Sequence, residues 1–364
     1  MAGAGNLAHI AADSFAGIVT DARGPRDIIR SVQTPLENAL SAPISAGGRD
    51  LRIAFSAGIA VCPDDATDAG DLLGKAEAAL KSAKARAERF LFFQPQMTER
   101  FAETLLLENK LRRALELGEF VMHYQPKVNA ITGRVTGVEA LIRWDDPETG
   151  LVPPGRFIPL LESTGMILAV GDWAIEQALR DCRAWVSQGH APLRVAVNVS
   201  SLQLQRPDFV EQVRRATRAF PDGAGYLDLE ITESLIMQDI DANIERLSAL
   251  RDMGIKIAVD DFGTGYSSLA YLARLPIHAL KIDRTFVDSM VTSPESMTIV
   301  TTIIMMARSL GLKVIAEGVE TLTQAQYLHQ TRCDEFQGFL FSKPLPPEAI
   351  PAFLRANASA PPVG

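Results

Sequence analysis

Short apolar runs rich in β-branched residues alternate with helical patterns from Glu119 onward. Eight of these runs are predicted to be strands: Phe120–Tyr124, Arg134–Arg143, Leu193–Val199, Tyr226–Ile231, Ile255–Asp260, Ala279–Ile282, Leu312–Ala316 and Glu335–Phe341. Helices are predicted between most of them, for example at Asp172–Gln188, Asp239–Met253, Met297–Leu310 and Leu322–Gln330. Eight strands with intervening helices in about 240 residues predict an α/β fold of the (β/α)8 barrel type. A doubly wound open sheet is the alternative, and it is less favoured because no glycine-rich phosphate loop follows an early strand.

Residues 1–98 have a different, alanine-rich texture. The elements expected there are a strand at Ser14–Val19, a helix after Pro25, a strand at Leu51–Val61 and a helix at Asp71–Glu88. Asp68 is placed to cap the last of these helices. Glu99–Leu117 is predicted to be an amphipathic helix that joins the two blocks, because its leucines recur near helical spacing.

Composition and charge narrow the class of protein. The chain has 364 residues, of which 47% are hydrophobic and 22% charged, which suits one large domain with a smaller piece. A net charge of -8 argues against binding to a DNA or RNA duplex, which needs a basic face. Three scattered cysteines, Cys62, Cys182 and Cys333, form neither a disulfide framework nor a zinc motif, so we expect a cytoplasmic protein.

Membrane signals are weak throughout the chain. Met1–Leu7 lacks the basic and apolar parts of a signal peptide, and the most apolar stretch, Met297–Ala307, is too short to span a bilayer. We therefore expect no membrane contact from this chain, and the sequence does not bear on any sensory or membrane segment that precedes Met1 in the natural protein.

Polar residues recur at the ends of the predicted strands. They are Glu139, Asn198, Glu230, Asp260, Asp261, Lys281, Glu317 and Gln337. In a (β/α)8 barrel the carboxyl ends of the strands converge on one face, which carries the active site. Residues far apart in the sequence are thus expected to form one acidic bowl.

The chemistry of this bowl points to hard metal ions. Carboxylate and amide oxygens select Mg²⁺ or Mn²⁺, and the five histidines fall outside the cluster, so a zinc hydrolase is not indicated. Two such ions are a standard arrangement for in-line phosphoryl displacement, and Lys281 is suited to orient the attacking water. The predicted substrate class is a phosphodiester.

Individual positions have competing interpretations. Glu139 and Arg143 lie four apart and share one strand face, yet Arg143 in a buried ion pair is an equally good interpretation. Asp260 and Asp261 can both face a metal pair only if the strand stops there, and Gly263-Thr264-Gly265 would supply that stop, although a capping turn is the simpler interpretation of the pair alone. Glu230–Glu233 could equally be a capping box.

The ordered series of motifs resembles the EAL domains, the phosphodiesterases specific for cyclic-di-GMP. The likeness covers residues 105–358 and rests on Tyr124–Lys127, Glu139–Trp144, Asn198–Ser200, Glu230–Glu233, Asp260–Leu269, Leu280–Asp283, Glu317–Glu320, Gln337-Gly338 and Ser342–Leu345. It implies a TIM-like barrel whose first strand is antiparallel, two Mg²⁺ or Mn²⁺ ions, and hydrolysis of cyclic-di-GMP to linear pGpG in bacterial second-messenger signalling.

The resemblance also implies a role for each matching residue. One ion would be held by Glu139, Asn198, Glu230 and Asp260, and the second by Asp260, Asp261 and Glu317. Lys281 would hold the attacking water with Gln337 nearby. Gln125 and Arg143 would contact the substrate, and Pro344 would border a guanine. Glu233 would steady the Asp261–Leu269 loop at the family's dimer face, so we expect a homodimer through the barrel.

The first block resembles the C-terminal half of a GGDEF (diguanylate cyclase) domain. The likeness rests on Ser56–Ala60, Cys62–Asp65 and Leu72–Lys84, while the signature position reads Ala11-Ala12-Asp13-Ser14-Phe15 and lacks the glycines and the metal-binding acid. We expect a partial, degenerate α+β fragment at residues 1–98 without cyclase activity. We favour the interpretation that this fragment is a structural remnant over the alternative that it senses GTP. A linking helix at 99–118, the EAL domain at 105–358 and a tail at 359–364 complete the predicted layout.

Two rival functions would use the same fold. One is a catalytically inactive receptor for cyclic-di-GMP, a type that typically loses metal ligands, and this sequence keeps every ligand position of the motif series. The other is a scaffold whose barrel serves for dimerisation. Both rivals predict no nucleotide turnover in saturating Mg²⁺ or Mn²⁺.

Overall fold

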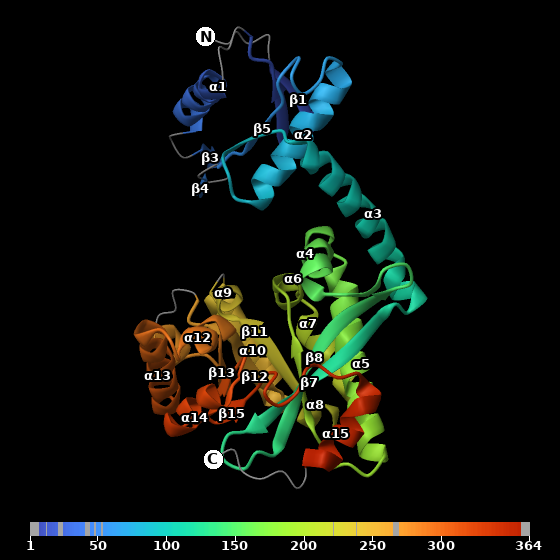
Figure 1. Cartoon of the computed structure of the whole chain (residues 1–364), viewed down its shortest axis with the longest axis vertical. Coiled ribbons are helices and arrows are strands. Elements are labelled where there is room, and N and C mark those ends of the chain that lie inside the picture. Colours follow the sequence, from blue (N-terminus) through green and yellow to red (C-terminus); the bar gives the residue numbers. More distant parts are fainter. Residues whose placement is uncertain are drawn as a thin grey trace. The chain divides into compact units, whose positions relative to one another are not determined.

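The computed structural model describes residues 7–11, 13–20, 25–40, 44–46, 49–51, 54–220, 222–237, 239–264 and 269–357. The chain divides into two compact units, Met1–Leu107 and Glu108–Gly364, and each is described by itself. Helix α3 (Pro95–Leu117) begins in the first unit and ends in the second (Figure 1). It starts four residues before the predicted Glu99, because a proline at the first helical position is pre-set for a helix.

The described part of the first unit contains short strand pairs, two helices and the start of α3. Its elements are β1 (Leu7–Ala11), β2 (Ser14–Gly17), α1 (Pro25–Leu40), β3 (Ile44–Ala46), β4 (Arg49–Leu51), β5 (Ala57–Ile59), α2 (Ala69–Ala85) and β6 (Phe90–Phe92). The pairs β1–β2 and β3–β4 are antiparallel, and β5–β6 is parallel. Helix α2 packs directly on β5, since a Cβ at Gly58 would lie 2.1 Å from the Leu80 backbone nitrogen.

The predicted cap of α2 is present in this unit, but the strand predicted before it is not. Asp68 caps α2 as predicted, because its side chain accepts hydrogen bonds from the backbone of Gly70 and Asp71. The single strand predicted at Leu51–Val61 is wrong. Leu51 ends β4, which pairs within a hairpin, and a separate strand begins at Ala57. Residues 52 and 53 of that run lie outside the described part of the chain.

The second unit is a closed barrel of eight strands. They are β7 (Phe120–Asn129), β8 (Val135–Asp146), β10 (Arg194–Asn198), β11 (Leu227–Thr232), β12 (Lys256–Phe262), β13 (Ala279–Ile282), β14 (Lys313–Ala316) and β15 (Glu335–Phe336). Pairing of β8 with β10 closes the ring, which rules out the open-sheet alternative. The first strand, β7, is antiparallel to both β8 and β15 as predicted, while the other neighbouring pairs in the ring are parallel. A short strand β9 (Gly150–Val152) extends β8 outside the ring.

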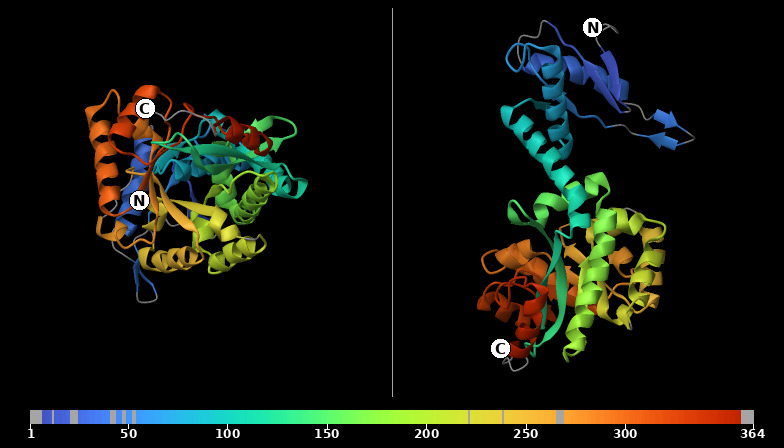
Figure 2. Two further views of the ribbon diagram at one scale, coloured as in Figure 1. Left: turned by 90° about the horizontal axis from the view of Figure 1, so that it is seen from below. Right: turned by 90° about the vertical axis from the view of Figure 1, so that its right-hand side faces the viewer.

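Helices lie around the outside of this barrel (Figure 2). They are α4 (Pro154–Thr164), α5 (Ile167–Ser187), α6 (Ser201–Gln205), α7 (Phe209–Arg218), α8 (Gly223–Tyr226), α9 (Glu233–Ile236), α10 (Ile240–Asp252), α11 (Leu269–Leu272), α12 (Arg284–Ser289), α13 (Pro294–Ser309), α14 (Leu322–Gln330) and α15 (Ile350–Asn357), with the 3-10 turn η1 (Pro347–Ala349) before α15. Among the described residues, no helix has the length and apolar character needed to cross a membrane.

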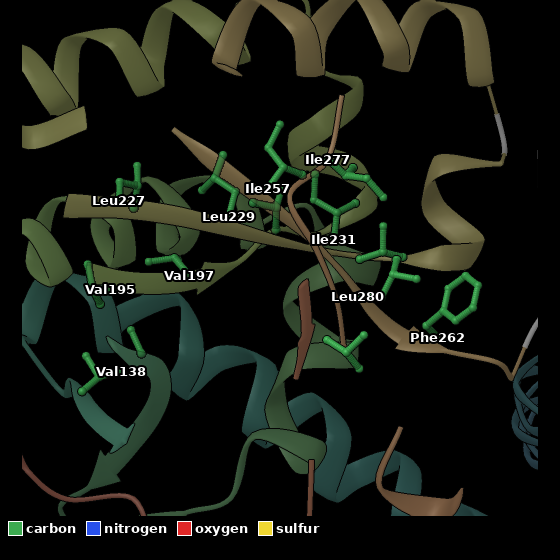
Figure 3. Packing of buried hydrophobic residues seen from close by; sticks show 14 of the residues in the cluster. Val138, Val195, Val197, Leu227, Leu229, Ile231, Ile257, Phe262, Ile277 and Leu280 are labelled. Atoms are coloured by element: carbon green, nitrogen blue, oxygen red, sulfur yellow. The ribbon is translucent and has the colours of Figure 1, made fainter. Parts of the chain in front are cut away.

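Alternation along the strands separates an apolar outer face from a polar lumen. In β11, Leu227, Leu229 and Ile231 belong to the main hydrophobic cluster, and Glu230 between them does not. Figure 3 shows the outward side chains of several strands packed in this cluster. Because successive strand residues point to opposite faces, each apolar outward position forces its neighbour into the lumen. The same alternation holds for Ala258 and Lys281, which lie between outward-facing core residues.

The last barrel strand is shorter than predicted. The run Glu335–Phe341 was expected to be one strand, but β15 ends at Phe336. The cause is a close backbone approach at Gly338, where a Cβ would lie 2.1 Å from the carbonyl oxygen of Val319. The chain therefore leaves the sheet directly after Gln337, which places this glutamine at the carboxyl end of the strand.

Candidate active site

The buried ammonium of Lys281 is the centre of the barrel lumen. Lys281 lies in β13 and has no exposed surface. Its Nζ lies 2.5 Å from Glu317 Oε1, 3.0 Å from Asp260 Oδ1 and 3.6 Å from Glu139 Oε2, and it also pairs with Glu230 Oε2. Burial alone would lower the pKa of Lys281, but the surrounding carboxylates raise it well above its ordinary value. The lysine is therefore charged, and it brings four of the predicted site residues together.

Glu230 is clamped between two lysines. Its Oε2 accepts from Lys281, and its Oε1 accepts from Lys127 on β7. Burial alone would raise the pKa of Glu230, but the two ammonium groups lower it to about 2. Glu230 is therefore an ionised carboxylate although only 1% of its surface is exposed.

A chain of side-chain amides runs beside the carboxylates. Asn198 Nδ2 donates to Glu139 Oε1 at 2.7 Å, and Gln337 Nε2 donates to Glu139 Oε2 at 2.5 Å. The same Gln337 nitrogen donates to Gln125 Oε1 at 3.1 Å, and Gln125 Nε2 donates to the carbonyl oxygen of Ser342. These contacts fix the orientation of Glu139 from both sides.

The Asp260–Asp261 pair departs from the expected geometry. We predicted that the strand stops at these residues, but β12 continues to Phe262. The register of β12 against β13 shifts between Val259 and Phe262, and Asp261 has a left-handed φ of 53°. This bulge turns the chain locally, so both carboxylates reach the same side without ending the strand.

Asp260, Asp261 and Glu317 form a compact acidic group. One carboxylate oxygen from each lies within 4.8 Å of the others. Burial and the neighbouring acids Asp260 and Asp283 raise the pKa of Asp261 to about 6. Burial, with Asp260 and Glu139 adding to it, raises the pKa of Glu317 to about 8 although Lys281 opposes the shift. Like charges crowded in a buried site favour a cation that offsets them.

Glu233 supports the turn that follows β12. Its buried carboxylate accepts a hydrogen bond from the Gly263 backbone nitrogen at 3.1 Å, and Gly263 itself has a left-handed φ of 103°. The capping-box interpretation of Glu230–Glu233 is wrong, because Thr232 at the start of α9 makes no side-chain cap hydrogen bond. Of the predicted Asp261–Leu269 loop, residues 265–268 lie outside the described part of the chain.

The predicted substrate contacts lie along β7 and β8. Arg143 is half-buried and shares the inward face with Glu139, and its Nη1 donates to the carbonyl oxygen of Ile142. It makes no ion pair with any described residue, which weighs against the buried ion-pair interpretation. Pro344 lies in the segment that pairs with β7, since Tyr124 and Leu345 exchange backbone hydrogen bonds.

The donor set fits divalent cations of the hard type. The candidate ligands offer only carboxylate and amide oxygens, which match Mg²⁺ or Mn²⁺ better than zinc or copper. Beside these ligands, the buried Oε1 of Gln337 has no hydrogen-bond partner among the described residues. A buried acceptor of this kind needs a donor, and water in a polar site would supply one.

Two residues of the lumen face were not predicted to be site residues, although Lys127 belongs to a motif named above and the histidines were placed outside the cluster. Lys127 pairs with Glu230, and burial lowers the pKa of His123, with Arg143 adding to the effect. Both lie on β7, two residues on either side of Gln125, so they share its inward face. The spacing of two residues on either side of Gln125 could have predicted that both side chains face the lumen.

Comparison with known proteins places this barrel in a family. The sequence profile of the EAL domain matches residues 108–344. The chain belongs to the EAL domain family, and the phosphodiesterases of that family depend on metal ions.

Two relatives from Pseudomonas aeruginosa resemble most of the chain. The bifunctional diguanylate cyclase/cyclic di-GMP phosphodiesterase MucR is 41% identical over 94% of this chain and 50% of its own length. The cyclic di-GMP phosphodiesterase NbdA is 43% identical over 90% of this chain and 42% of its own length. The chain thus spans half or less of the length of these curated relatives.

A solved structure of the PaMucR phosphodiesterase in complex with c-di-GMP is similar to the barrel. It is 46% identical to this chain, with a TM-score of 0.66, and covers 67% of this chain and 99% of the solved one.

Proposed function

We propose that the barrel is a metal-dependent phosphodiesterase that hydrolyses cyclic-di-GMP to linear pGpG. The observation that carries this proposal is the group of Asp260, Asp261 and Glu317 beside the buried ammonium of Lys281. The names of MucR and NbdA and the ligand of the solved PaMucR structure support the choice of substrate. On this proposal, the protein acts in bacterial second-messenger signalling.

The proposal includes two Mg²⁺ or Mn²⁺ ions. Glu139, Asn198, Glu230 and Asp260 would hold one ion, and Asp260, Asp261 and Glu317 the other. Bound ions of this type lower the pKa of water and offset the charge of the phosphate oxygens. The Asn198–Glu139 hydrogen bond supports the first set, and the close approach of the Asp260, Asp261 and Glu317 carboxylates supports the second.

The remaining residues act on water and substrate. The Lys281 ammonium holds the attacking water and offsets negative charge that develops on the phosphate. The Oε1 of Gln337, which has no hydrogen-bond partner among the described residues, accepts a hydrogen bond from the same water. Gln125 and Arg143 contact the substrate from β7 and β8, and Pro344 borders a guanine.

Turnover of cyclic-di-GMP by the purified chain tests the proposal. Formation of pGpG is followed by chromatography with Mg²⁺ or Mn²⁺ and with EDTA as the control. Glu139→Ala and Lys281→Ala should abolish turnover while circular dichroism shows the fold retained. Lys313→Met is the matched control, since Lys313 pairs with Glu335 at the amino end of β14. Wild-type turnover by either alanine variant would refute the mechanism, and binding without any turnover would favour an inactive receptor.

We infer that the first unit is a degenerate remnant of a GGDEF domain without cyclase activity. The alignment with MucR covers 94% of the chain and so extends into residues 1–98. At the signature position, Asp13 is engaged by its own unit, because Lys84 Nζ lies 3.1 Å from its Oδ2 and Ser14 donates to Oδ1. Ala12 of that signature lies outside the described residues. Calorimetry with GTP is the test, and sub-millimolar affinity would refute a purely structural role.

We also propose that the barrel forms a homodimer through the face next to the β12 loop. Val291 after α12 and Met297 and Met305 on α13 are exposed apolar side chains. Helix α13 approaches the end of β12, because Ile303 lies against Gly263. Light scattering of the purified chain should give the mass of a dimer, and Met305→Asp should lower it. Leu322→Asp, which changes an exposed leucine on α14, is the control. A monomeric wild-type chain would contradict the proposal.

A further inference from the structure

A second buried lysine lies deep in the lumen. Lys127 is 5% exposed, and its Nζ pairs with Oε1 of Glu230. Glu230 itself is 1% exposed, so this ion pair lies almost entirely out of water. A buried lysine needs a specific compensating partner, and Glu230 provides it.

The reversed direction of β7 explains how Lys127 comes to lie under the candidate metal ligands. Gln125 is opposite Glu139 in the register of β7 and β8, and Lys127 is opposite Gly137. Gly137 precedes Glu139 by two residues in β8, so Lys127 is one inward-facing step further from the mouth. Glycine offers no side chain at that position, and Ala258, which is opposite Glu230 in the register of β11 and β12, is small. Space for a long side chain thus exists below the ligand layer.

Each oxygen of Glu230 has its own lysine. Lys281, which lies on β13, donates to Oε2. Lys127, which lies on β7 at the other side of the barrel, donates to Oε1. A carboxylate held at both oxygens cannot rotate freely, so its orientation is set before any ligand arrives. Partners that orient a metal-binding carboxylate are worth roughly 10–100-fold in metal affinity.

We propose that Lys127 is a positioning residue that fixes the Glu230 carboxylate for divalent-cation binding and does not itself contact the substrate. This inference rests on the proposed function, because it assigns Glu230 to the metal site. The positive charge of Lys127, taken alone, predicts the opposite change in cation affinity. If Lys127 only added positive charge near the site, its removal would tighten the binding of a cation.

The test is Mn²⁺ affinity of the EDTA-stripped protein, measured by calorimetry without substrate. Lys127→Met should weaken Mn²⁺ binding about 10–100-fold, as expected for loss of an orienting partner. In a Glu230→Gln background the same change should have little effect, because the double-mutant cycle isolates action through Glu230. Lys313→Met, which removes a lysine paired with Glu335 at the far end of β14, should bind Mn²⁺ like the wild type.

Three results would overturn the proposal. They are wild-type Mn²⁺ affinity in Lys127→Met, tighter binding in that variant, or an equal loss in the Glu230→Gln background. If Lys127→Met does not fold, Lys127→Arg is the variant to measure, because it keeps the positive charge but changes the length and shape of the side chain. Weaker Mn²⁺ binding by Lys127→Arg would support the positioning role, and wild-type Mn²⁺ binding would refute it. The readout contains no nucleotide, so a failure of the phosphodiesterase proposal would appear separately, as absent turnover by the wild type.

Discussion

Replacement of Lys281 by methionine should destabilise the metal-stripped barrel. Methionine nearly matches the lysine stem in length but removes the ammonium that four carboxylates surround at distances of up to 3.6 Å. Lys281 has no exposed surface, so water cannot replace the lost charge. Removing one partner of a buried ion pair costs about 3–5 kcal/mol, because the other partner is left uncompensated.

This magnitude is large enough to measure by thermal unfolding. For a domain of this size, about 1 kcal/mol shifts Tm by about 2–4 °C, so Lys281→Met should lower Tm by roughly 6–20 °C in EDTA. Excess Mn²⁺ should narrow the gap to the wild type, because divalent cations offset the same carboxylates. Lys256→Met is the control, since Lys256 is an exposed residue at the start of β12 and exposed charges contribute little.

An unchanged Tm for Lys281→Met in EDTA would refute this reasoning. It would mean that the carboxylates of the lumen do not depend on the lysine for compensation. An equal loss of Tm with and without Mn²⁺ would mean that the destabilisation comes from packing of the side chain and not from its charge.

Three further predictions concern the loop, the pH dependence and the end of β15. Glu233→Ala should weaken Mn²⁺ binding in calorimetry, because it removes the acceptor for Gly263, whereas Glu233→Gln keeps an acceptor and should restore most of the affinity. The raised pKa of Glu317, about 8, keeps this acid protonated at lower pH. Mn²⁺ binding at pH 7 should therefore release about one proton, and affinity should fall about tenfold per pH unit below 8; a pH-independent affinity would contradict this. Gly338→Ala should cost about 1–3 kcal/mol or more in denaturant unfolding, because its Cβ would overlap the Val319 backbone; wild-type stability would show that the turn relaxes freely.

Most of the barrel was predictable from local patterns. Strand alternation and helical spacing depend on residues close in sequence, and Ala279–Ile282 and Leu322–Gln330 have the predicted bounds. The predictions failed where a distant backbone intervened. The end of β15 is set by contact between Gly338 and Val319, and the bulge at Asp261 arises between β12 and β13.

The candidate site was predictable in its membership but not in its contacts. The sequence by itself determined which polar residues stand at or next to strand ends, and a period of two assigns Glu139, Glu230 and Lys281 to the lumen. Asp261, which directly follows Asp260, reaches the same side only through the bulge in β12. Closure of the barrel decided which of these side chains contact one another. It brought Lys281 among carboxylates from other strands, and the reversed β7 brought Lys127 to Glu230, 103 positions away in the chain. Such pairings depend on strand order, direction and register, which are properties of the whole barrel and of no single segment.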